Sequence, residues 1–115
     1  MTVKEFADKM ALKNWTPDVD LDAAITGGYA GDMLSWVMGR AAAGVAWMTI
    51  MTNQNVAAVA LMADVSCVVL TENVAPDEAL LKQAQTRGLP LFSSALSTYE
   101  LSSRLGALLA DKRDV

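Results

Sequence analysis

The chain has 115 residues, enough for one domain with a buried core, and 53% of them are hydrophobic while 6% are aromatic. Ala, Val, Leu and Met must therefore form most of that core. The net charge is −4 and the nine Lys and Arg residues are scattered along the chain, so we expect no nucleic-acid partner.

The types of residue that are missing exclude several kinds of chemistry. There is no His, which removes His-dependent triads and His metal sites. Cys67 is the only Cys, so no intramolecular disulfide is possible, and its apolar surroundings predict a buried, inert thiol. Asp32, Asp64 and Glu72 belong to different segments, and their spacing matches no known pattern of metal ligands. We therefore expect no catalytic residue, no metal site and no cofactor.

Nothing in the sequence indicates export or a membrane. The first five residues carry charge and lack an apolar signal core. The two most apolar stretches, residues 41–52 and 56–70, are shorter than the roughly 18 residues that a membrane span needs. We expect a cytoplasmic protein with no membrane association.

The N-terminal quarter predicts a helix and then a strand. The Thr2-x-x-Glu5 pattern is typical of a capping box, and the helix that it opens should continue to about Lys13. Pro17 cannot continue it. Residues 21–25 then alternate apolar and polar side chains, which predicts the first strand.

A glycine-rich run, residues 26–32 (TGGYAGD), follows this strand and precedes a predicted helix from Asp32 to about Arg40. Asp32 is well placed to cap that helix. The run could be a tight turn or an anion site made of backbone N–H groups. It matches neither G-x-G-x-x-G nor the G-K-[ST] ending of a P-loop, and Asp32 adds negative charge. The turn is the favoured interpretation, and the anion site stays open.

Three further strand and helix pairs complete the chain. Strands are predicted at residues 46–51, 66–70 and 89–92. They alternate with helices at about 56–63, 77–87 and 97–110, the last opened by a second capping-box pattern, Ser97-x-x-Glu100. Such alternation is typical of a single α/β domain, over residues 1–115, with a mostly parallel four-stranded sheet and helices on both faces.

In such sheets ligands bind where loops leave the carboxyl ends of the strands. The loop of residues 52–55 (TNQN) offers hydroxyl and amide groups, although helix capping explains it better. If a ligand binds, we expect it to contact the glycine run and this loop. The residues concerned are Gly27, Gly28, Tyr29, Gly31, Asp32, Thr52, Asn53 and Asn55.

Three segments give the chain a family resemblance. Residues 28–41 (GYAGDMLSWVMGRA), 46–52 (AWMTIMT) and 55–60 (NVAAVA) resemble stand-alone DRTGG-domain proteins. The resemblance extends over residues 21–109. The Asp-Arg-Thr-Gly-Gly sequence that names the family is absent, and only Thr26-Gly27-Gly28 is similar to part of it.

The resemblance implies an α/β domain similar to the N-terminal domain of HPr kinase/phosphorylase. Related domains accompany phosphate acetyltransferases and CBS-containing pyrophosphatases and are regarded as regulatory or ligand-sensing. Kinase activity is not expected, because the chain has no P-loop and no catalytic domain. A regulatory module that binds a small anionic metabolite or nucleotide, and reports to a partner protein, is one hypothesis. An interaction or assembly subunit without a ligand is the other, and a small enzyme is least favoured.

Self-association is a separate prediction. Residues 56–63 (VAAVALMA) carry no polar stripe, and the helix before them adds Met33, Trp36, Val37 and Met38. Because exposed apolar patches usually mark interfaces, we expect a homodimer built around one or both helices, with a heteromeric partner as the alternative.

Overall fold

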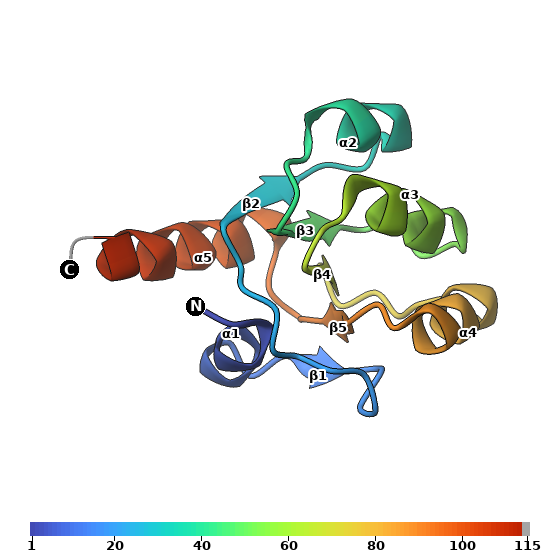
Figure 1. Cartoon of the computed structure of the whole chain (residues 1–115), viewed down its shortest axis with the longest axis horizontal. Helices are drawn as coiled ribbons and strands as arrows, with labels where there is room; N and C mark the ends of the chain where they lie inside the picture. Colours follow the sequence, from blue (N-terminus) through green and yellow to red (C-terminus); the bar gives the residue numbers. More distant parts are fainter. Residues whose placement is uncertain (114–115) are drawn as a thin grey trace.

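One five-stranded sheet forms the centre of this computed structural model, which describes residues 1–113 (Figure 1). Its strands lie in the order β1-β5-β4-β3-β2. They are β1 (Lys13–Asn14), β2 (Gly27–Ala30), β3 (Val45–Thr49), β4 (Cys67–Leu70) and β5 (Leu91–Ser93). Strands β2 to β5 are parallel neighbours, and β1 pairs antiparallel with β5. The sheet is therefore mixed.

Helices cover both faces of this sheet. The helices α2 (Leu34–Arg40), α3 (Asn55–Ala63) and α4 (Glu78–Arg87) join the parallel strands and pack on one face. The other face is covered by α1 (Val3–Lys9) and α5 (Thr98–Arg113). The predicted single α/β domain with helices on both faces is confirmed, but the predicted mostly parallel, four-stranded sheet is wrong. Residues 114 and 115 of the predicted domain lie outside the described residues.

The additional strand exists because the first helix is shorter than predicted. Its capping box is present, with Thr2 Oγ1 accepting a hydrogen bond from the Glu5 N–H at 3.1 Å. The helix ends at Lys9, since Ala11 adopts a left-handed conformation (φ 50°) that a right-handed helix cannot include. The released residues Lys13 and Asn14 pair with β5 and form β1.

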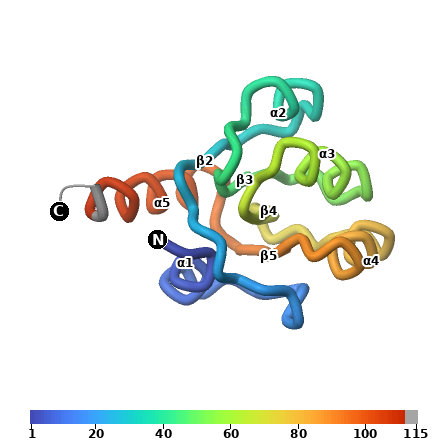
Figure 2. The backbone as a smooth tube through the Cα atoms, viewed as in Figure 1, coloured from blue at the N-terminus to red at the C-terminus, as the bar shows by residue number. Residues whose placement is uncertain are grey.

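The strand predicted at residues 21–25 is also wrong, because the backbone of this segment binds the N-terminus instead. Ala23 and Leu21 accept hydrogen bonds from the N–H groups of Val3 and Lys4, and the Ile25 N–H donates to Met1. Figure 2 shows the segment passing α1 before it enters the sheet. The first parallel strand begins only at Gly27, inside the glycine run.

The other three predicted strands are confirmed with shifted ends. β3, β4 and β5 overlap residues 46–51, 66–70 and 89–92. They are buried along their whole length, as expected for strands covered on both faces.

Two apolar clusters, one on each face, form the core. Trp47 and Val68 point toward α2, α3 and α4, whereas Met48 and Val69 point toward α1 and α5. The uniform apolar character of α3 follows from its position, because it packs against both α2 and α4 as well as the sheet. Within the described residues, no helix combines the length and hydropathy needed to cross a membrane.

Candidate functional site

The structure divides the residues predicted to contact a ligand into two groups. Gly27, Gly28 and Tyr29 belong to the edge strand β2 and pair with Val45, Ala46 and Trp47, so they do not form a loop. Gly31 and Asp32 follow the carboxyl end of this strand. Thr52, Asn53 and Asn55 follow β3, which is the neighbouring strand. The carboxyl edge therefore brings together only the second group of residues.

Gly31 is held against the end of β3 from two sides. Its N–H donates to the Met48 carbonyl at 3.1 Å, and its carbonyl accepts a bond from the Trp47 indole N–H at 2.9 Å. A Cβ at this position would lie 3.0 Å from the Tyr29 ring. These contacts fix the backbone path between β2 and α2.

Asp32 joins β2 to β3 and does not cap α2. Its Oδ1 accepts hydrogen bonds from the Thr49 hydroxyl at 2.8 Å and the Ile50 N–H at 3.0 Å. Thr49 is fully buried. The N-cap of α2 is Met33, with no side-chain hydrogen bond, so the predicted capping role is wrong. Sequence spacing could not reveal a partner 17 residues away on another strand.

The loop after β3 forms a local turn at the start of α3 and gives the helix no side-chain cap, because the N-cap residue, Gln54, makes no side-chain hydrogen bond. Asn53 Oδ1 accepts a bond from the Asn55 N–H at 2.9 Å, which forms a local turn where α3 begins. The Thr52 carbonyl accepts from the Asp77 N–H at 2.9 Å, linking this loop to the start of α4. The turn uses the Asn53 Oδ1 atom and leaves the Asn53 amide NH₂ as an additional donor.

The loops after β4 and β5 meet where a ligand crevice would be expected. Their connections lead to α4 and α5 on opposite faces of the sheet, which is the arrangement that opens a crevice between neighbouring strands. Here the chain closes it. Glu72 Oε2 accepts from the Thr98 N–H at 3.1 Å, and the Glu72 N–H donates to Leu96.

Glu72 is a structural residue that the sequence did not reveal. It and Asn73 both have a φ of 61°, in the left-handed region, which Asn adopts readily and Glu rarely. Two consecutive left-handed residues direct the Glu72 side chain back over the start of α5. The predicted capping box there is half confirmed, because Ser97 Oγ accepts from the Glu100 N–H while Glu100 binds Arg104.

The charge of this edge does not suit a phosphate group. The loops after the four parallel strands, residues 31–33, 50–54, 71–77 and 94–97, contain Asp32, Glu72 and Asp77 but no Lys or Arg. Two of these carboxylates already occupy the N–H groups of Ile50 and Thr98. Any ligand here would have to be recognised mainly by neutral and apolar groups.

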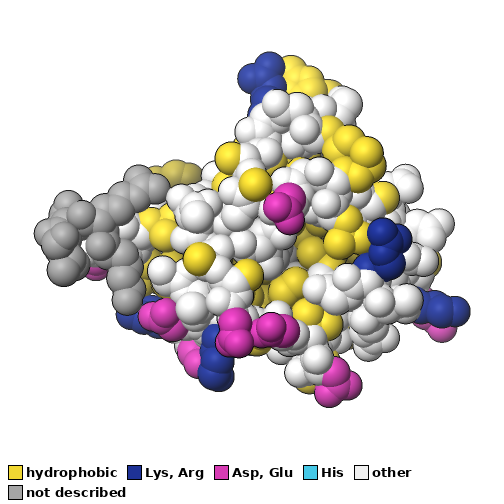
Figure 3. All heavy atoms as spheres, viewed as in Figure 1, with side chains coloured by type: hydrophobic (Ala, Val, Ile, Leu, Met, Phe, Trp, Pro, Cys, Tyr) yellow, Lys and Arg dark blue, Asp and Glu magenta, His cyan; other side chains and the backbone are white. Residues whose placement is uncertain are grey.

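Apolar side chains are exposed beside these loops. Met33 is 61% exposed, Trp36 53% and Ile50 44%, and Figure 3 shows hydrophobic side chains gathered over α2. The Arg40 guanidinium lies over the Trp36 ring, 4.2 Å from its centroid. We call Met33, Trp36, Met38 and Ile50 the α2 patch.

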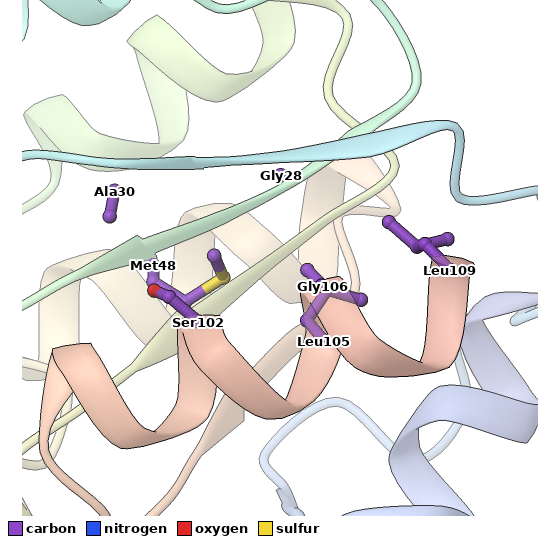
Figure 4. A pocket seen from close by; sticks show the side chains of 7 residues that line it. All are labelled: Gly28, Ala30, Met48, Ser102, Leu105, Gly106 and Leu109. Carbon is purple, nitrogen blue, oxygen red and sulfur yellow. The ribbon is translucent and has the colours of Figure 1, made fainter. Parts of the chain in front are cut away.

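A cavity of about 280 Å³ lies on the other face of the sheet, between β2 and α5 (Figure 4). Gly28 and Ala30 form one wall, while Leu105, Gly106 and Leu109 form part of the other. Ser102 also lines it, and its buried hydroxyl finds no hydrogen-bond partner among the residues that the structure describes. Of the predicted ligand contacts, Gly28 alone lines this cavity.

Burial decides the chemical state of the single Cys. Cys67 is fully buried, and burial raises the pKa of its thiol to about 12, so it is an inert core residue at neutral pH. Among residues 1–113, no three Cys, Asp or Glu side chains come close enough together to hold a metal ion.

Comparison with known proteins supplies the remaining findings. A family model described as DRTGG domain matches residues 22–108, close to the predicted extent of 21–109. The fold is similar to the CBS and DRTGG domains of the regulatory region of Clostridium perfringens pyrophosphatase, solved in complex with its activator, diadenosine tetraphosphate. The TM-score is 0.66 at 10% identity, covering 89% of this chain and 44% of that chain. This chain therefore spans less than half of that structure. No curated protein matches this chain.

Proposed function

This chain belongs to the DRTGG domain family, and we propose that it is a non-catalytic regulatory domain that binds a small metabolite at the loops following β2 and β3. The family match carries the proposal, because it spans residues 22–108. The similar solved structure is a regulatory region and not a catalytic domain. Both comparisons support regulation as the role of this chain.

A nucleotide is the ligand class that we propose. The similar regulatory region binds a dinucleotide activator, although it contains CBS domains as well, and the fold likeness does not assign the nucleotide to either domain. In this chain, the absence of Lys and Arg from the loops at the carboxyl edge favours recognition of the base and ribose over the phosphates. Thr52 and Asn53 offer hydroxyl and amide groups, and Met33 and Ile50 offer apolar surface beside them. Gly31 and Asp32 would hold the loop in place.

Thermal unfolding with three probes tests this function. Diadenosine tetraphosphate and AMP should raise the melting temperature, because a ligand at 100 times its Kd stabilises the native state by about 2.7 kcal/mol. Inorganic triphosphate should not, since it lacks the base. No shift with either nucleotide would end the nucleotide proposal, and a shift with triphosphate alone would assign the site to phosphate.

Matched variants test the position of the site. Thr52→Val removes one hydroxyl and should weaken nucleotide binding severalfold. Thr86→Val makes the same change on the exposed surface of α4 and should leave binding unchanged. Amide shift changes in nuclear magnetic resonance spectra should centre on Gly31, Asp32, Thr52 and Asn53. Changes centred elsewhere would refute this placement.

A second function, assembly with a partner protein, is supported by the α2 patch. Only Val37 of α2 is buried, so this short helix presents most of its apolar side chains to solvent. A photo-crosslinking residue at position 36 should capture one specific protein, whereas the same residue at position 86 should not. Equal capture from both positions would remove the support for this alternative.

A further inference from the structure

The two edges of the sheet differ in how they are protected from pairing with another strand. β1 has two residues, one of them Lys13, whose ammonium lies over the Trp15 ring at 4.0 Å from its centroid. Pro17 follows shortly afterwards. A short strand with Lys and a nearby Pro is the usual protection of a sheet edge. β2 has four residues, Gly27–Ala30, without charge or Pro.

The unprotected edge is also accessible. Gly28 and Ala30 are exposed, whereas Gly27 and Tyr29 are half-buried. In a parallel pair, alternate residues direct their N–H and C=O groups to the same neighbour. The Gly31 N–H binds Met48 of β3, so Gly27 and Tyr29 share that direction. The backbone groups of Gly28 and Ala30 then face the open edge.

We propose that two copies of this chain associate through β2, which pairs antiparallel with β2 of the second copy about a two-fold axis. A strand can pair with itself in this way only if like charges do not meet across the axis. Residues 26–31 carry no charge, so this condition is met. The result is one continuous sheet across both copies.

The position of α5 favours a second copy over a peptide from another protein. α5 packs against both β2 and β3, so its axis lies near the boundary between these strands. With strands about 4.8 Å apart, two such helices would lie about 10 Å from each other on the same face of the joined sheet. Helices pack at interaxial distances of about 8–10 Å. The second copy therefore supplies a helix at the right distance.

The cavity between β2 and α5 lies where the two α5 helices would meet. Its β2 wall consists of the small residues Gly28 and Ala30, and Gly106 and Leu109 contribute to the α5 wall. Small residues let helices and strands approach closely, and a neighbouring α5 would place its own apolar side chains there. The proposal differs from the homodimer predicted from α2 and α3, because it places the contact at β2 and α5; in α3, Val56, Ala57, Val59 and Ala60 are already buried within the domain.

Light scattering at about 100 µM tests the association, with dilution to measure its Kd. We expect twice the chain mass of 12.2 kDa. Ala30→Lys places a charge on the β2 edge and should raise the dissociation constant at least about tenfold. Gly106→Glu should do the same from α5, and the monomer should stay folded because, within the described residues, a Cβ there would meet no atom within 4 Å apart from its chain neighbours and the adjacent backbone of α5. Trp36→Ser, on the α2 patch, should not change the mass.

Hydrogen exchange shows whether the contact is a strand pair. The Gly28 and Ala30 amides should be protected in the wild-type dimer, and Gly28 should lose this protection in Ala30→Lys. A wild-type mass near 12.2 kDa at 100 µM would overturn the proposal. A dimer that Trp36→Ser dissociates, while the β2 and α5 variants leave it intact, would also overturn the proposal. A dimer in which the Gly28 and Ala30 amides exchange freely would do the same.

Discussion

Asp32 shows how a single side chain can be assigned the wrong partner. Its place before a helix suggested a cap, yet its carboxylate binds Thr49 and Ile50 at the end of β3. Local sequence favours the cap because the N–H groups of the first helical turn follow Asp32 directly in the chain. The tertiary fold instead offers the buried Thr49 hydroxyl, which is costly to leave without an acceptor.

Removing the Asp32 carboxylate should therefore destabilise the domain. Asp32→Ala leaves the buried Thr49 hydroxyl without its acceptor, at a cost of about 1–3 kcal/mol, whereas water can replace the acceptor of the exposed Ile50 N–H. Asp32→Asn keeps an oxygen acceptor and should cost less. Urea denaturation measures both. Equal loss in the two variants would show that the charge, and not the hydrogen bonds, matters.

Gly44 is the glycine with the strictest requirement. Its φ is +85°, and a Cβ would lie 2.7 Å from Thr26 Oγ1. Gly88 has a φ of +70° but open space around it. Gly88→Ala should cost about 1–2 kcal/mol from backbone strain alone, and Gly44→Ala should cost more because the clash is added. Chemical denaturation of the pair measures the difference, and equal costs would refute the role of the clash.

Cys67 should make stability fall at alkaline pH. Burial raises the pKa of its thiol from 9.0 to about 12, so above pH 9 the unfolded chain loses this proton while the folded chain keeps it. The free energy of unfolding should then decrease by up to about 1.4 kcal/mol per pH unit between pH 9 and 12. Cys67→Ala lacks the thiol, and its stability should depend less on pH over this range. Identical pH slopes would contradict the burial argument.

At the scale of elements, the capping box of α1 was predictable because its residues lie within one turn. Thr2→Ala removes the acceptor for the Glu5 N–H and should cost about 0.5–2 kcal/mol. Thr2→Ser keeps the hydroxyl and should cost less. Thermal unfolding compares them, and a neutral Thr2→Ala would show that the N-terminal backbone bonds alone hold α1.

β2 is the element whose position sequence patterns missed. The alternation of residues 21–25 is genuine, but their backbone groups bind Met1, Val3 and Lys4. β2 starts at Gly27, two residues after the end of the predicted strand, in a glycine run that local propensity assigns to a turn. Gly28 suits a strand here because a Cβ would approach Leu105 of α5 to 2.9 Å. Packing against another element outweighed local preference.

At the scale of the whole molecule, the family-matched segment does not contain the complete core. Residues 1–21 lie outside the match, yet Val3 and Phe6 are fully buried on the α5 face of the sheet. Phe6→Ala should cost about 3–5 kcal/mol, as for other buried aromatic truncations. Urea denaturation measures this loss, with exposed Lys9→Ala as the control. A small loss would mean that the domain closes without α1.

Sequence alone determined the family, the three central strands and the presence of helices on both faces. The DRTGG resemblance is confirmed by the match over residues 22–108, while the similarity to HPr kinase/phosphorylase stays a prediction. These features could be found because burial on both faces gives β3, β4 and β5 apolar runs, and such runs are visible without knowing any contact.

Only the tertiary structure decided the edges of the sheet and the partners of the site residues. Edge strands β1 and β2 are short, half-buried and lack an apolar signature, so their place depends on which backbone groups neighbouring segments leave unpaired. The partners of Asp32 and Glu72 lie 17 to 26 residues away. Local pattern reports what a residue can do within one turn or strand, whereas hydrogen bonds at such separations are fixed by the path of the whole chain.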